Sequence, residues 1–182
     1  MQDIIFVTSN KNKLEEFETA LRMKLKSMNI DVDEIQTLDV EKVVRDKAIK
    51  SYNEIRKPVI VEDTGVYLKN KNGFPGALIK WLVNCLGTEQ IALLFKHDPA
   101  YFKTAIAYYD GQEMQVFTGE LQGHISDQVR GNNGFGLDPV FIPENMKCTL
   151  AELPIQEKVR ISHRSKALYK FGEYLNNKTT LL

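Results

Sequence analysis

The chain has 182 residues, of which 43% are hydrophobic and 26% are charged. This length allows one domain to bury a core without disulfides or a structural metal. Lysine and arginine together number 24, as do aspartate and glutamate, so no overall field favours the phosphate backbone of a polymeric nucleic acid. We expect one domain over residues 1–182, ordered except at residues 179–182.

Cysteine usage and the start of the chain indicate a compartment. Cys85 and Cys148 lie far apart and form no C-x-x-C pair, so the sequence favours neither a disulfide framework nor a zinc site. The apolar run at residues 4–7 is too short for a signal peptide or a membrane span. We therefore expect a soluble, cytoplasmic protein that binds no membrane.

Helical and strand-like segments alternate along the chain. Residues 4–7 predict a strand, and Leu14, Phe17, Leu21 and Leu25 follow at helical spacing. A helix over 43–55 precedes a strand at 59–61. The pattern then predicts a turn at 74–76, a helix that ends near Gly87, and a further helix capped by Thr88.

The second half begins with a predicted β-hairpin, in which strands at 103–109 and 114–117 flank a tight turn at Asp110 and Gly111. The last helix is expected to begin after Ser162 and to bury Ala167, Leu168, Phe171 and Leu175. The whole pattern predicts an α/β fold with a mixed sheet.

Two segments carry groups suited to phosphate and metal. The loop from Thr8 to Lys13 lies between a predicted strand and helix, where backbone N–H groups and lysines attract anions; alternatively, a loop residue only caps the helix and the lysines are solvated. Glu62 and Asp63 follow the strand at 59–61, with Gly65 permitting a turn that exposes them. Carboxylates there suit Mg²⁺, although an exposed turn is the alternative.

Two further segments have features of a nucleobase pocket. The glycine-rich loop at 131–139 carries Phe135, which can stack on a base, or else pack in the core. His163 and Arg164 stand in the first turn of the last helix, where the dipole disfavours cations. An anionic or carbonyl-bearing ligand would offset this cost, although a structural histidine is the alternative.

In this order, these residues resemble the inosine triphosphate pyrophosphatase family, also called the Ham1 family. The matching pieces run from residue 8 to residue 164. They are Thr8-Ser9-Asn10 with Lys13, Glu34-Ile35-Gln36, Lys47-Ala48, residues 61–65, residues 73–76 with 79–81, residues 134–139, and Glu157-Lys158 with Ser162-His163-Arg164. Two positions depart from the family pattern, because Ser9 replaces a glycine and Leu137 replaces an aromatic residue.

The resemblance implies an elongated mixed sheet flanked by helices, two lobes with the active cleft between them, and a homodimer. It implies Mg²⁺-dependent hydrolysis of ITP, dITP and XTP to the monophosphate and pyrophosphate. Asp63 would be the catalytic base and, with Glu34, a metal ligand; Glu41 remains the alternative to Glu34. The implied substrate-binding residues are Thr8, Ser9, Asn10, Lys13, Lys47, Thr64, Lys80, Phe135, Gly136, Leu137, Asp138, Lys158, His163 and Arg164.

Selectivity would come from an Arg164 fork directed at the 6-keto oxygen of the purine. Two other classes stay open. A pyrophosphatase for pyrimidine or modified nucleotides, as in the Maf family, would share the phosphate chemistry but not the Ser162-His163-Arg164 signature. A nucleotide sensor without catalysis would not need Glu34 and Asp63.

Overall fold

The computed structural model describes residues 4–180. Within that range the strands form one seven-stranded mixed sheet in the order β2-β1-β3-β5-β6-β7, with β4 paired to β3. The three long strands are β3, β5 and β6, and β5 pairs antiparallel with both of the others along nearly their whole length. The strands are β1 (Ile5–Val7), β2 (Lys26–Met28), β3 (Val59–Leu68), β4 (Pro75–Gly76), β5 (Pro99–Tyr109), β6 (Met114–Ile125) and β7 (Phe141–Pro143).

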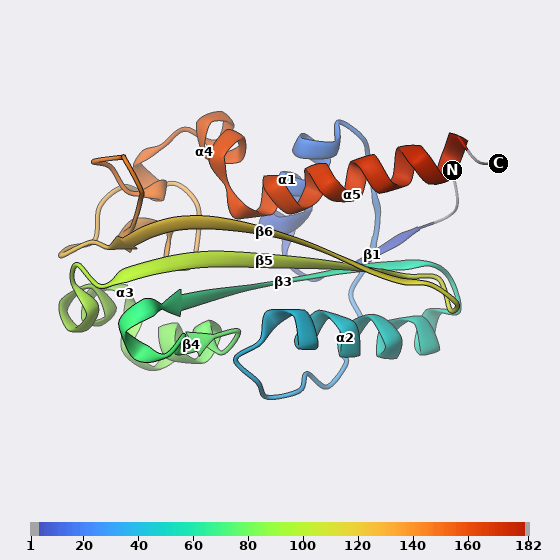
Figure 1. The fold of residues 1–182 in the computed structure, drawn as a ribbon, viewed down its shortest axis with the longest axis horizontal. Helices are drawn as coiled ribbons and strands as arrows, with labels where there is room; N and C mark the ends of the chain where they lie inside the picture. The colour runs from blue at the N-terminus through green and yellow to red at the C-terminus, as the bar shows by residue number, and fades with distance from the viewer. Residues whose placement is uncertain (1–3, 181–182) are drawn as a thin grey trace.

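Helices cover both faces of this sheet (Figure 1). Helices α1 and α5 lie on one face, and α2 lies on the other. The bounds of the helices are α1 (Lys11–Leu21), α2 (Val40–Ile55), α3 (Ile79–Phe95), α4 (Ile155–Ile161) and α5 (His163–Thr180). The predicted α/β class with a mixed, elongated sheet is confirmed.

Strand alternation divides the core into clusters on opposite faces. Ile60 of β3 faces the α1 and α5 side, where it packs with Phe17 and Phe171. Its neighbour Val61 faces α2 and packs with Val44. Successive side chains of a strand point to opposite faces, so residues further along β3 must follow the same alternation.

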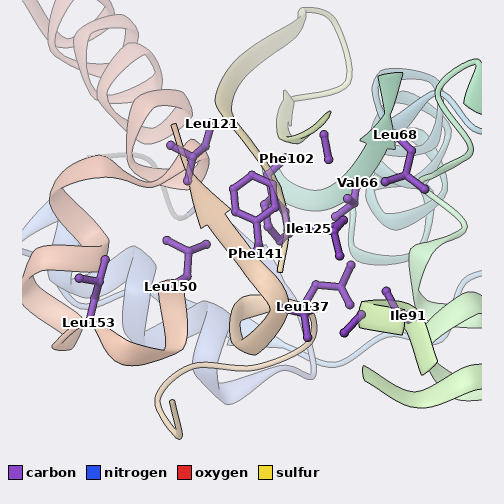
Figure 2. Close-up of a cluster of buried hydrophobic side chains, with 13 residues drawn as sticks. Val66, Leu68, Ile91, Phe102, Leu121, Ile125, Leu137, Phe141, Leu150 and Leu153 are labelled. Atoms are coloured by element: carbon purple, nitrogen blue, oxygen red, sulfur yellow. The ribbon is translucent and has the colours of Figure 1, made fainter. Parts of the chain in front are cut away.

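A third cluster occupies the far end of the long strands, where α3 packs (Figure 2). It includes Val66, Phe102, Leu121, Leu137 and Phe141, which come from β3, β5, β6, the loop after β6, and β7. Strands β3 and β5 contribute residues to all three clusters. The molecule therefore has a hydrophobic core at each end of its long strands.

Several predicted elements are confirmed. The strand at 4–7, the hairpin at 103–117 and the helix over 43–55 are all present, the first slightly shorter and the other two longer than predicted. Gly87 interrupts α3 with a positive φ of 73°, which produces the expected division into two helical segments. Ser162 caps α5, because its hydroxyl oxygen accepts a hydrogen bond of 3.0 Å from the Ser165 N–H.

Three expectations were wrong. Leu25 lies outside α1, because Arg22 ends the helix in the left-handed conformation and the chain continues into β2. The strand after Pro58 does not end at residue 61 but runs to Leu68, held by β5 along its length, so Gly65 lies within a strand and forms no turn. Helix α5 continues to Thr180, and residues 181 and 182 lie outside the described range.

Candidate active site

A gap along one edge of β3 creates the site. Strand β1 pairs with β3 only at Val59 and Ile60, and β4 pairs with it only at Val66 and Tyr67. Between these points no other strand of residues 4–180 occupies that edge. Side chains from both faces of β3 can therefore reach the space at this open edge. The loop that follows β1 lies beside the same space.

A cavity of about 450 Å³ lies at this gap, a volume usual for small-molecule sites. Its lining extends from Val7 and Ile30, next to the core at one end, to Ile79 and Phe102, next to the core at the other. The cavity also brings together every residue that the sequence analysis assigned to the site: Thr8, Ser9, Asn10, Lys13, Glu34, Lys47, Asp63, Thr64, Lys80, Phe135, Gly136, Leu137, Asp138, Lys158, His163 and Arg164.

The loop before α1 combines capping with charge. Asn10 caps the helix, because its side-chain oxygen accepts hydrogen bonds from the N–H groups of Asn12 and Lys13. Lys13 is not solvated, however, since its side chain is only 19% exposed and its amine lies 2.8 Å from Glu62 and 3.9 Å from Asp63. The loop thus places a paired cation at the positive end of a helix dipole.

Asp63 lies on the α2 side of β3, next to Val61 in the alternation. Burial raises the pKa of its carboxyl to about 6, and the neighbouring Glu62 and Glu34 charges add to the effect while Lys13 and Lys47 oppose it. A carboxylate with a pKa near neutrality is suited to accept a proton from water. Among the carboxyls of the cavity lining, Asp63 is therefore a candidate for proton transfer.

Glu34, rather than Glu41, accompanies Asp63 in the cavity. The Glu34 carboxylate lies 2.5 Å from the amine of Lys47, which projects from α2. Glu41 forms an ion pair of 2.7 Å with Lys103 and is absent from the lining of this cavity. The arrangement therefore favours Glu34 as the second carboxylate.

The cavity offers few side chains that could hold a metal. Among the described residues no group of three or more histidine, cysteine, aspartate or glutamate side chains is placed to hold a metal. Two carboxylates in a cavity with lysines suit Mg²⁺, which keeps several waters and shares substrate phosphate oxygens rather than filling a protein cage. Glu34 and Asp63 are the side chains that would hold it.

The opposite end of the cavity is shaped by the loop at 131–138. Phe135 is half-buried, with the Lys158 amine 4.9 Å from its ring centroid, while Leu137 is the residue of this loop that enters the core. Asp138 accepts a hydrogen bond of 2.7 Å from the Phe135 N–H. The loop thus holds an aromatic face at the edge of the cavity, where a planar ligand can stack.

A larger and more open depression, of about 1050 Å³, lies between α1, β6 and α5. Its lysines are engaged, since Lys166 and Lys170 donate hydrogen bonds to the backbone carbonyls of Glu120 and Thr118. It contains none of the perturbed carboxylates described above, so the smaller cavity is the stronger candidate for chemistry.

Comparison with known proteins places this chain in a family. A model of the Ham1 family matches residues 4–174. The chain belongs to the Ham1 family. It is 38% identical over 179 residues to a dITP/XTP pyrophosphatase of Saccharolobus solfataricus, covering 95% of this chain and 93% of the relative. It is 36% identical over 178 residues to that of Thermococcus kodakarensis, covering 94% and 96%.

Solved structures of Ham1 proteins share the fold. A HAM1 protein from Coxiella burnetii superimposes with a TM-score of 0.80 at 26% identity, covering 97% of this chain and 100% of the other. The Staphylococcus aureus Ham1 protein gives a TM-score of 0.76 at 27% identity, covering 96% and 98%. The resemblance stated from the sequence motifs is therefore confirmed.

In this Ham1 chain, Arg164 forms ion pairs within the protein. Arg164 is 3% exposed, and its two terminal nitrogens donate to Glu16 and, over 3.2 Å, to Glu62. A buried guanidinium requires such counter-charges. Its terminal nitrogens therefore pair with carboxylates of the protein, which offset the cost of a cation in the first turn of α5, and Arg164 also lines the cavity.

Glu16 and Glu62 pair with the cations of the site, and neither belongs to the set that the resemblance implied. Glu16 accepts from Lys158 over 2.9 Å as well as from Arg164, and Lys158 also donates to Asp138 over 2.8 Å. Burial tends to raise the pKa of Glu62, but the charges of Arg164 and Lys13 outweigh it and hold that pKa well below its usual range. Glu62 stands beside Asp63 in a recognised motif, whereas nothing local distinguishes Glu16 from the other glutamates of its helix.

Proposed function

We propose that this protein hydrolyses non-standard purine nucleoside triphosphates, such as ITP, dITP and XTP, to the monophosphate and pyrophosphate. The observation that carries the proposal is the cavity in which Asp63, Glu34, Lys13 and Lys47 converge. Membership of the Ham1 family and relatives named dITP/XTP pyrophosphatases support the choice of substrate.

The reaction would be attack of water on the α-phosphorus of the bound nucleotide. A bond forms between the water oxygen and the α-phosphorus, the bond from that phosphorus to the bridging oxygen breaks, and pyrophosphate leaves. Asp63 accepts the proton of the water, for which its raised pKa fits it. Mg²⁺, when held by Glu34 and Asp63, would neutralise phosphate charge and make the bound water more acidic.

Lys13 and Lys47 approach the same space from two sides, one from α1 and the other from α2. Their charges would stabilise the negative charge that grows on the phosphate oxygens as the bond breaks. Each now contacts a carboxylate, Glu62 or Glu34, so the lysines are held in place before the triphosphate arrives. Lys80 would add a further cation at the α3 side of the cavity.

The base would lie at the loop at 134–138, with Phe135 stacked on its face and His163 at its edge. Arg164 and Lys158 would then act by holding Glu62, Glu16 and Asp138 in position, not by contacting the 6-keto oxygen. This assignment modifies the role expected for Arg164 while keeping the purine at the same end of the cavity.

The test is a pyrophosphate-release assay with ITP, dITP, XTP, GTP, ATP and the pyrimidine triphosphates, with and without Mg²⁺. We expect release from the first three in the presence of Mg²⁺. Inorganic phosphate as the first product would refute the assigned bond. A preference for pyrimidine triphosphates would favour the Maf-like alternative, and binding without turnover would favour a sensor.

A pair of lysine variants tests the role of the cavity. Lys47→Met should abolish most of the pyrophosphatase activity. Lys50→Met should not, because Lys50 lies on the same helix but pairs with Asp46.

Two further properties belong to this proposal. We infer a homodimer from the resemblance to the family, and light scattering on the purified chain would refute it by giving the mass of one chain.

We also infer a cytoplasmic location, where nucleotide pools are maintained, and the two free cysteines accord with a reducing compartment. No helix within residues 4–180 has the length and apolar composition needed to cross a membrane.

A further inference from the structure

A line of three hydrogen bonds connects Glu62 to His163 across the sheet. Thr64 and Thr104 are directly opposite each other on β3 and β5. The Thr64 hydroxyl lies 2.7 Å from the Glu62 carboxylate and 2.6 Å from the Thr104 hydroxyl. The Thr104 hydroxyl in turn lies 2.5 Å from Nδ1 of His163. We call these four residues the hydroxyl relay.

The direction of the relay is set by Glu62. Its two oxygens face permanent cations, Arg164 at 3.2 Å and Lys13 at 2.8 Å, so the group is an ionised carboxylate and can only accept. Thr64 must therefore donate its hydroxyl hydrogen to Glu62. Otherwise the Thr64 and Glu62 oxygens would face each other at 2.7 Å with no hydrogen between them.

Each hydroxyl carries a single hydrogen, so the direction propagates. Having donated to Glu62, Thr64 must accept from Thr104, and Thr104 must then accept from the histidine. The proton of the imidazole ring is thereby placed on Nδ1 of His163. Because Thr64 has given its hydrogen to Glu62, a bare Nδ1 would leave Thr104 with two acceptors and only one hydrogen.

His163 is held neutral by its surroundings. It is 3% exposed, its ring stacks on Phe102 with centroids 4.7 Å apart, and it is the first residue of α5, at the positive end of the helix dipole. Burial and the adjacent Arg164 charge also keep the pKa of His163 well below its usual value. A neutral ring protonated at Nδ1 has a lone pair at Nε2.

Nε2 of His163 is available to a ligand. His163 lines the cavity, and within residues 4–180 only its Nδ1 atom takes part in a side-chain hydrogen bond. We propose that Thr64 and Thr104 are positioning residues that lock His163 as the Nδ1–H tautomer, so that Nε2 accepts a hydrogen bond from a nucleobase N–H.

This inference rests on the proposed function and assigns its selectivity. Hypoxanthine and xanthine carry a hydrogen on N1, which can donate to Nε2. Adenine carries a lone pair on N1, which would face the lone pair of Nε2 and leave both acceptors unpaired. Guanine also carries N1–H, so the relay separates 6-oxo from 6-amino purines and leaves the choice among 6-oxo purines to other contacts.

The test combines ring ¹⁵N NMR with kinetics on Thr104→Val and Thr104→Ser. The chain has three histidines, and His97→Asn and His124→Asn assign the signals. In the nucleotide-free wild type we expect a pyrrole-type Nδ1 and a pyridine-type Nε2 for His163. Thr104→Ser should keep this tautomer, whereas Thr104→Val should move the proton to Nε2 and lower the ratio of kcat/KM for ITP over ATP about tenfold or more.

A protonated Nε2 in the wild type would overturn the relay, and so would a valine variant with unchanged tautomer and unchanged ITP preference. The wild-type spectrum decides the tautomer even if Thr104→Val does not fold. Because it is recorded without nucleotide, it also separates the two proposals. The wrong tautomer with intact pyrophosphate release overturns the relay alone, whereas the expected tautomer without hydrolysis of any triphosphate overturns the proposed function and its selectivity.

Discussion

Replacing Asp63 with asparagine should abolish turnover and yet make the protein more stable near neutral pH. Burial raises the pKa of this carboxyl from the ordinary 3.8 to about 6, a difference of about two pKa units. At roughly 1.4 kcal/mol per unit, the fold disfavours the ionised form by about 3 kcal/mol. Asparagine has nearly the same shape and carries no charge, so Asp63→Asn should recover a large part of that free energy.

The gain should depend on pH in a defined direction. At about pH 3 and below, the carboxyl is mostly protonated in both the folded and the unfolded states, so the wild type loses almost no stability. Between about pH 4 and pH 6 the folded state binds more protons than the unfolded state, and wild-type stability falls as pH rises. The gain in free energy of unfolding from Asp63→Asn should therefore be nearly absent at the lowest pH. It should grow between about pH 4 and pH 6 and stay constant above about pH 6.

Urea unfolding in the presence of a metal chelator, at several pH values between about 3 and 7, measures this difference. Glu62→Gln is the matched control, because it makes the same change at the adjacent strand position. The pKa of Glu62 is held low despite burial by Arg164 and Lys13, so this variant should be less stable than the wild type near pH 7, and its deficit should shrink as pH falls below about 4.5. An Asp63→Asn protein no more stable than the wild type near pH 7, or one with a pH-independent advantage, would refute the reasoning.

Two other predictions concern the remaining carboxylates. Glu16→Gln leaves two buried cations with one fewer counter-charge and should lower the free energy of unfolding by about 3 kcal/mol; the exposed neighbour Glu15→Gln should change the urea midpoint little, and equal effects would contradict the buried network. Glu34→Gln should raise the Mg²⁺ concentration for half-maximal activity about tenfold or more, whereas Glu41→Gln should leave it near the wild-type value. The reverse order in a Mg²⁺ titration would move the metal to Glu41.

Local signals in the sequence predicted most elements and several of their ends. Ser162 was identified as a helix cap because a side-chain oxygen at that position satisfies free N–H groups of the same turn. Gly87 was identified as a break because a positive φ suits glycine. Prediction failed at residue 61, where the strand continues because β5 supplies hydrogen-bond partners, and these partners lie about forty residues away in sequence, as the Thr64 and Thr104 pair shows.

The residues that line the site could also be identified from the sequence, whereas the ion pairs between them could not. Motifs in register along the chain identified residues that all line one cavity. The sequence does not show, for example, that Glu16, 148 positions before Arg164, pairs with its guanidinium. A free and a paired arginine look the same in a sequence.

The sequence by itself determined the long strands and most of the helices, the caps that bound several of them, and a set of motifs specific enough to indicate the Ham1 family. These depend on short-range sterics, periodicity and residue chemistry, which are local properties of the chain. The sequence did not predict the short elements β2, β4, β7 and α4. Only the tertiary structure decided that β3 has an open edge, that acids on its two faces meet there, and which carboxylate holds which cation. The physical reason is that burial and charge pairing depend on the approach of segments far apart in sequence, and these set the charge of Glu62, the raised pKa of Asp63 and the tautomer inferred for His163.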